Sequence, residues 1–113
     1  MRKGDIVVVD FGVPVGSEPA ARRPAVIVTS DATLASPIGT MHVVPLTTNL
    51  RRNAPTDINL ENSLVPGLER PSAAQAHLVS LVSRQRIVAE TGTNVGAVAL
   101  RQIREMLLDV LDL

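Results

Sequence analysis

Three short apolar runs rich in β-branched residues lie in the first half of the chain and constrain its fold more than any other feature. They are IVVVDF at 6–11, PAVIVTS at 24–30 and MHVVPLTT at 41–48. Each run has the length and residue types of a strand, and the segments between them contain the Gly and Pro of loops. The spacing therefore predicts three strands that follow one another closely.

Weaker signals predict the remainder of a β fold. Pro45 lies inside the third run and cannot donate to a strand ladder, so we expect an edge strand or a bulge there rather than the sheet centre. Further strands are predicted at 57–60, 73–82 and 87–91, with loops at 31–40 and 61–72 and a single turn at 83–86.

The segment 94–113 changes the period of the pattern. Its apolar residues recur at helical spacing, and Asn94 is of a type that caps helices. The expected apolar stripe is Val95, Val98, Ile103, Met106, Leu107, Val110 and Leu111. Short strands followed by one helix predict a mainly β (α+β) fold, a small barrel with a helix packed across it. The length of 113 residues suits one domain spanning 1–113.

Composition excludes several classes of protein. The chain has no Cys, which removes disulfides and thiolate metal sites, and its two His residues and scattered acids lack the spacing of a metal site. No apolar run is long enough to cross a bilayer. We therefore expect a cytoplasmic protein with no metal, no cofactor and no membrane contact.

Arginine supplies nearly all of the positive charge. The formal net charge is zero, yet ten of the eleven basic residues are Arg, whose planar fork binds phosphate at two points. Phe11 is the only aromatic residue, so stacking of bases on rings cannot be the main contact with a nucleic acid. In RRPAVIVTSD, Arg22 and Arg23 stand where a buried strand begins, and Pro24 fixes the backbone. Such rigid placement suits phosphate chemistry, although an exposed, salt-bridging Arg would give the same pattern.

Four stretches of the sequence, taken together, point to a family. KGDIVVVDFG, VGSEPAARRPAVIVTSD, VVPLTT and LLDVLDL resemble, in this order, the MazF/PemK/Kid toxin endoribonucleases of bacterial type II toxin–antitoxin systems. The resemblance implies an SH3-like, CcdB-like barrel and a sequence-specific, metal-independent endoribonuclease that cleaves single-stranded RNA. It also implies a homodimer and a cognate, MazE-like antitoxin, whose extended acidic tail would displace RNA from an Arg-rich groove.

The family's catalytic pair maps to Arg23 and Thr47. If the 2′-hydroxyl of the RNA is the nucleophile, the protein must stabilise negative charge on a five-coordinate phosphorus, which suits an Arg fork and a Thr hydroxyl. Arginine is a poor general base because it keeps its proton to high pH. Glu18, in the GSE motif, is the nearest candidate carboxylate and could instead orient Arg23, so the general base stays unassigned.

The residues expected to contact RNA are Ser17, Arg22, Thr48, Arg51 and Arg52. Arg51 and Arg52 follow the catalytic Thr, where they could hold flanking phosphates or form a polar hairpin tip. His42 and His77 belong to no catalytic motif of the family. We expect structural roles for both.

The chain departs from the family's pattern in one stretch. Where many members carry SVVLVDQIRTVDKxRL, this chain has SAAQAHLVSLVSRQRI at 72–87, so Leu78 and Ser80 replace a Gln and an Arg, and Pro19 replaces a Gln after GSE. The first of these changes removes groups that would line or brace the RNA groove, so the cleaved sequence does not follow from the resemblance. Two alternatives remain open, a catalytically silent member that binds its antitoxin or operator, and a CcdB-like gyrase poison.

Overall fold

The computed structural model describes residues 1–19, 21–50, 54–61 and 70–113. The predicted RNA-binding residues Arg51 and Arg52, and most of the predicted loop 61–72, lie outside the described residues.

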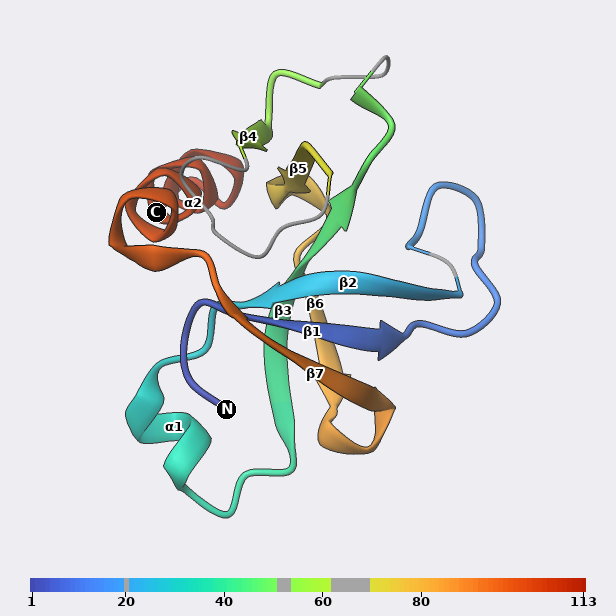
Figure 1. Cartoon of the computed structure of the whole chain (residues 1–113), viewed down its shortest axis with the longest axis vertical. Coiled ribbons are helices and arrows are strands. Elements are labelled where there is room, and N and C mark those ends of the chain that lie inside the picture. Colours follow the sequence, from blue (N-terminus) through green and yellow to red (C-terminus); the bar gives the residue numbers. More distant parts are fainter. Residues whose placement is uncertain (20, 51–53, 62–69) are drawn as a thin grey trace.

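The described residues form one antiparallel sheet (Figure 1). Its strands are β1 (Asp5–Asp10), β2 (Arg22–Ile27), β3 (Thr40–Thr47), β4 (Asp57–Leu60), β5 (Ser72–Gln75), β6 (Ser80–Ser83) and β7 (Ile87–Asn94). The order is β4-β5-β3-β2-β1-β7, and β6 also pairs with β3. The path ends at β4 and β7 rather than closing, so the molecule is barrel-like without being a closed barrel. The predicted mainly β fold with a terminal helix is confirmed.

Strands β1, β2 and β3 are buried on both faces, because two cores lie on opposite sides of the sheet. One core contains Ile6, Val26, Val44, Leu46, Leu60, Ala74, Val95, Ala99 and Ile103, and the other contains Val7, Val9, Ala25, Ile27, Leu34, Met41, Val43 and Val82. Successive residues of a strand point to opposite faces, so the neighbours Val43 and Val44 enter different cores. Burial on both faces explains why these strands read as continuous apolar runs.

Helix α2 (Gly96–Val110) covers the first core and confirms the predicted terminal helix. Asn94 Oδ1 accepts a hydrogen bond from the Gly96 amide at 2.8 Å, but the N-cap residue of the helix is Val95, which makes no side-chain capping bond, so the cap predicted at Asn94 is wrong. The predicted apolar stripe is wrong at two positions, because Val98 is 60% exposed and Leu111 is 51% exposed.

The buried face of α2 is set by its four-residue spacing. Val95, Ala99 and Ile103 are buried at steps of four, and Leu107 packs against the same core. Val98 lies off this line. The buried position that the sequence pattern predicts for Val98 is occupied by the smaller Ala99. Neither of the two α-helices in the described ranges has the length and apolar stretch needed to cross a membrane.

Two segments differ from the predicted secondary structure. The predicted loop 31–40 contains helix α1 (Asp31–Ala35), which begins because the Ser30 hydroxyl caps the Thr33 amide at 3.2 Å. The predicted strand 73–82 is two strands, β5 and β6, separated by the 3₁₀ turn η2 (Ala76–Leu78). The predicted single turn at 83–86 is confirmed as η3 (Arg84–Arg86).

The edge position predicted from Pro45 is also wrong. Strand β3 lies inside the sheet, with β2 on one side and both β5 and β6 on the other. Its register with β6 ends at Val43 and its register with β5 begins at Leu46, so Pro45 lies opposite the interruption made by η2. Because neither β5 nor β6 pairs with β3 at this position, the missing N–H of the proline costs no hydrogen bond there. The β4–β5 pair joins β3 through Leu46 and Thr47 alone among the described residues.

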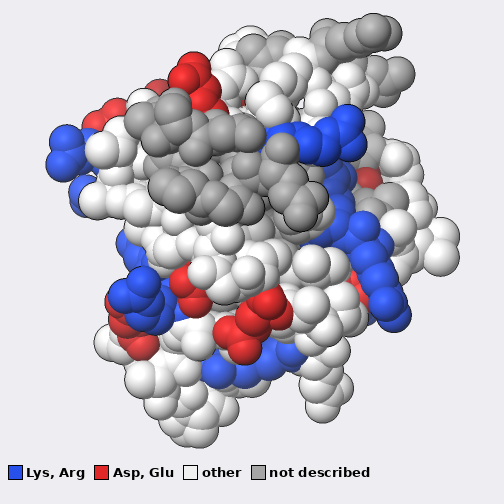
Figure 2. Space-filling model, in the orientation of Figure 1, with Lys and Arg blue, Asp and Glu red and all other residues white. Residues whose placement is uncertain are grey.

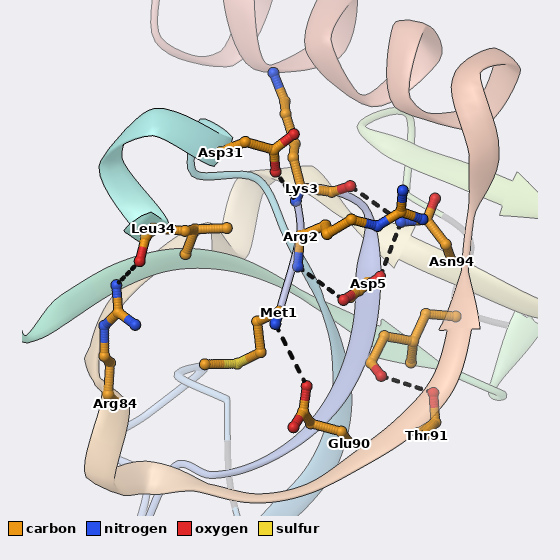
Figure 3. A network of polar contacts seen from close by, with 11 residues as sticks. Met1, Arg2, Lys3, Asp5, Asp31, Leu34, Arg84, Glu90, Thr91 and Asn94 are labelled. Atoms are coloured by element: carbon orange, nitrogen blue, oxygen red, sulfur yellow. Dashed lines mark hydrogen bonds and ion pairs between the residues drawn. The ribbon is translucent and has the colours of Figure 1, made fainter. Parts of the chain in front are cut away.

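A polar network ties the first residues to the start of α2 (Figure 3). The Asn94 side-chain amide donates to the Lys3 carbonyl and to Asp5 Oδ1, both at 3.0 Å, and the Lys3 amide donates to Asp31 Oδ1 at 2.7 Å. Partial burial acts to raise the pKa of Asp5. The hydrogen bonds from Asn94 and the Arg2 amide, with the positive charges of the N-terminus and Arg2, outweigh it and hold this pKa below its ordinary value of 3.8.

The sign of the Asp5 shift gives a pH dependence of stability. A carboxyl whose pKa is lowered by folding contributes stability above its unfolded pKa, and this contribution is lost as the pH falls through the folded value. We predict that Asp5→Asn lowers the free energy of unfolding at pH 7 by more than it does at about pH 3. Urea denaturation at the two pH values measures this, with the exposed Asp109→Asn as a control. An equal difference at both pH values contradicts the prediction.

Candidate active site

Arg23 is the second residue of β2 and stands directly before Pro24. Its guanidinium reaches the ends of two other strands: Nε and Nη2 donate to the Leu46 carbonyl at 3.2 and 2.8 Å, and Nη2 donates to Gln75 Oε1 at 2.8 Å. The side chain is half-buried, and this burial lowers the pKa of Arg23 from its ordinary value. The three bonds use Nε–H and both Nη2 hydrogens, so within the described residues the two Nη1 donors remain for a ligand.

A pocket of about 230 Å³ opens beside this guanidinium. It is lined by Arg23, Pro24, Leu46, Thr47, Thr48 and Ser72. Thr47 Oγ1 accepts a hydrogen bond from the Asn49 amide at 3.1 Å, which leaves the hydroxyl proton for donation. The structure therefore brings together three of the predicted site residues, Arg23, Thr47 and Thr48.

Glu18 and Ser17 lie in a different pocket. This second pocket, of about 400 Å³, is lined by Ser17, Glu18, Pro19, His77, Leu78, Val79 and Ser80. Glu18 Oε1 accepts a hydrogen bond from the Val15 amide at 2.8 Å, and the acceptors that orient Arg23 are Leu46 and Gln75 instead. The roles expected of Glu18 and Ser17 stay predictions. The three positions at which the sequence departs from the family pattern all line this second pocket.

Arg22 is exposed at the start of β2, and its Nε lies 3.8 Å from Asp10 Oδ2. An exposed pair of this kind contributes little to stability, so Arg22 is available to a ligand. Figure 2 shows basic side chains gathered beside the place where β2 begins in Figure 1. This side of the molecule is therefore the more positive part of the face shown.

The sequence prediction did not identify Gln75. A signal was present, because Gln75 is polar and lies between the fully buried Ala73, Ala74 and Ala76. A polar residue inside a buried segment needs a hydrogen-bond partner. Only the fold shows that this partner is Arg23, which is 52 residues away in the chain.

His77 links η2 to the start of β4 by polar contacts. Its Nδ1 lies 2.8 Å from Thr56 Oγ1 and 3.8 Å from Asp57 Oδ1. The Asp57 side chain is 2% exposed, and its Oδ1 has no hydrogen-bond partner among the described residues. These contacts fit the structural role predicted for His77.

The described residues contain no group of three or more His, Asp or Glu side chains that could hold a metal ion.

We predict that His77→Ala lowers the free energy of unfolding by about 1–2 kcal/mol, because it removes the bond to Thr56 and leaves the buried Asp57 carboxylate without its neighbour. The matched control is His42→Ala, since His42 is exposed on β3 and should cost under about 0.5 kcal/mol. Chemical denaturation of both variants measures the difference. Equal values would show that the Thr56–His77 contact contributes nothing.

Comparisons with known proteins identify the class. The family model of the PemK-like, MazF-like toxin of type II toxin–antitoxin systems matches residues 2–111. The endoribonuclease MazF9 of Mycobacterium tuberculosis is 34% identical over 117 residues, which cover 100% of this chain and 98% of that protein. The chain belongs to the PemK-like, MazF-like toxin family, as the sequence motifs predicted.

Solved structures agree on the fold. MazF from Deinococcus radiodurans superposes with a TM-score of 0.83 at 23% identity, over 100% of this chain and 97% of that one. An endoribonuclease from a mycobacterial species, solved in complex with its cognate antitoxin, gives a TM-score of 0.73 at 18% identity, over 100% and 94% of the two chains.

Proposed function

We propose that this chain is a sequence-specific, metal-independent endoribonuclease toxin that cleaves single-stranded RNA by attack of the substrate's own 2′-hydroxyl. The observation that carries this proposal is the pocket in which Arg23 and Thr47 meet, within a chain of the PemK-like, MazF-like family. The relative named endoribonuclease MazF9 supports the same activity.

The residues of the pocket suit charge stabilisation. As the 2′-oxygen attacks, negative charge grows on the non-bridging oxygens of the phosphate, and donors already in place lower the energy of that state most. The two Nη1 donors of Arg23 and the Thr47 hydroxyl are of the required type. Half-burial of Arg23 reduces the solvent screening of its charge and strengthens this effect.

Glu18 is proposed as the carboxylate that accepts a proton; the alternative role of orienting Arg23 falls to the Leu46 carbonyl and Gln75 instead. Ser17, Arg22 and Thr48 are proposed to contact the RNA strand on either side of the scissile phosphate. The same roles are proposed for Arg51 and Arg52, which lie outside the described residues.

The partners proposed are a second copy of this chain and a cognate antitoxin with an extended acidic tail, in the cytoplasm. The mycobacterial endoribonuclease solved with its antitoxin supports the second partner. The C-terminal residues Leu108, Leu111 and Leu113 are exposed apolar side chains, and we propose that they help to cover the dimer seam.

Removal of the Arg23 fork should abolish most of the activity. We predict that Arg23→Ala lowers kcat by about 10² to 10³-fold, the usual cost of losing one donor to a developing oxyanion. The matched control is Arg104→Ala, since Arg104 is exposed on α2, and it should cut at the wild-type rate. Cleavage of a labelled transcript measures both rates. Unchanged cutting by Arg23→Ala refutes the assignment.

The identity of the nucleophile gives a second test. We predict that a single 2′-deoxy substitution on the 5′ side of the cut removes cleavage at that position, while EDTA leaves cleavage of the all-ribose substrate unchanged. Cutting of the deoxy substrate would mean that water is the nucleophile. An RNA left intact both in EDTA and with Mg²⁺ would indicate a silent member of the family, and DNA breaks trapped in the presence of gyrase would indicate a gyrase poison.

A further inference from the structure

We infer that Gln75 is a positioning residue for Arg23: its side-chain oxygen orients the guanidinium so that the Nη1 edge is presented to the scissile phosphate. The inference rests on the proposed function of Arg23. Gln75 acts through Arg23 and has no role in the chemistry of its own.

The geometry shows why a second acceptor is needed. The Leu46 carbonyl accepts from both Nε and Nη2, so it holds one edge of the guanidinium at a single point. A planar group held at one point can still tilt about that point. Gln75 Oε1 accepts the other Nη2 hydrogen at 2.8 Å and comes from a different strand, so the two acceptors together fix the direction of the fork.

Gln75 is itself held firmly. It is the last residue of β5, where its backbone is in register with Asp57 of β4, and the neighbouring Ala74 is in register with Leu46 of β3. Two residues further along the chain, His77 Nδ1 lies 2.8 Å from Thr56 Oγ1. A residue whose backbone is fixed on both sides can hold its partner to the tolerance that a catalytic group requires.

The neutral amide explains why Gln suits this position. A carboxylate 2.8 Å from the guanidinium would orient it equally well, but its negative charge would offset the charge that the phosphate needs. An amide oxygen accepts the same hydrogen bond and leaves the full positive charge of Arg23 in place. We therefore expect Gln75→Leu and Gln75→Glu to fail in different ways.

The first experiment measures kinetics, after wild-type cleavage of RNA has been established. Gln75→Leu should lower kcat by about 10- to 100-fold, because a small misplacement of a catalytic group is costly, with KM within about twofold of wild type. Gln75→Glu should keep the orientation but raise KM and make RNA binding less dependent on salt, because one cation is neutralised. The matched control is Gln102→Leu on the exposed face of α2, which should behave as wild type.

A double-mutant cycle separates positioning from a general structural role. In the Arg23→Lys background, which has no guanidinium fork to orient, Gln75→Leu should cause no further loss of kcat. The same loss in both backgrounds would show that Gln75 acts independently of Arg23, and the inference would be wrong.

Nitrogen-15 NMR of the Arg23 guanidinium tests the same contact without any substrate. Hydrogen bonds at Nε and Nη2 slow rotation of the group, so wild type and Gln102→Leu should show separate, slowly exchanging Nη signals for Arg23. Gln75→Leu should merge or broaden them while the backbone spectrum is kept. Unchanged Arg23 signals in Gln75→Leu overturn the inference, whether or not the protein cuts RNA. If the signals change but the wild-type protein leaves RNA intact, the result counts against the proposed function alone.

Discussion

Burial of β1, β2 and β3 on both faces is the constraint on which the rest of the structure depends. Alternate residues of these strands enter two separate cores, one covered by α2 and the other containing Leu34 of α1. A strand packed on both sides cannot slip by one residue without sending every side chain to the opposite core. The register of β2 against β1 and β3 is therefore fixed, and with it the point at which the strand leaves the core.

Arg23 occupies that point. The fully buried residues of β2 begin at Ala25, two positions later, so the charged head remains close to solvent while its neighbours are held by packing. Partial burial makes the charged form less favourable, as the lowered pKa shows, and the hydrogen bonds to Leu46 and Gln75 compensate for the lost water. The arrangement resembles a functional site more than a surface ion pair, because an exposed pair such as Arg22 with Asp10 has no such support.

Much of this could be predicted from the sequence, because the strongest patterns reflect burial. The runs at 6–11, 24–30 and 41–48 overlap with β1, β2 and β3, since both faces of these strands are apolar, and the terminal helix follows from the spacing of its apolar residues. Arg23 and Thr47 were identified by family motifs, and the structure places both in one pocket.

The errors have physical reasons that local sequence does not reveal. Helix α1 is too short for a periodic pattern, and η2 lies in the middle of a mixed segment, 73–82, that carries no Gly or Pro to mark the break between two strands. Val98 was assigned to the core by its hydrophobicity, but Ala99 lies on the line of buried residues. Gln75 was missed because its significance depends on a partner from a distant strand, which becomes visible only once β2, β3 and β5 are assembled.

The narrow attachment of the β4–β5 pair to the sheet has a mechanical consequence. This hairpin is joined to β3 through Leu46 and Thr47, and these two residues also supply the carbonyl that holds Arg23 and the hydroxyl beside it. Leu46 and Ala74, which pair across this seam, both belong to the core under α2, so a force that separates β5 from β3 opens that core and displaces the groups around Arg23 together. Separation of these two strands would also carry Gln75 away from Arg23, so the pocket would lose its geometry with no ligand in it.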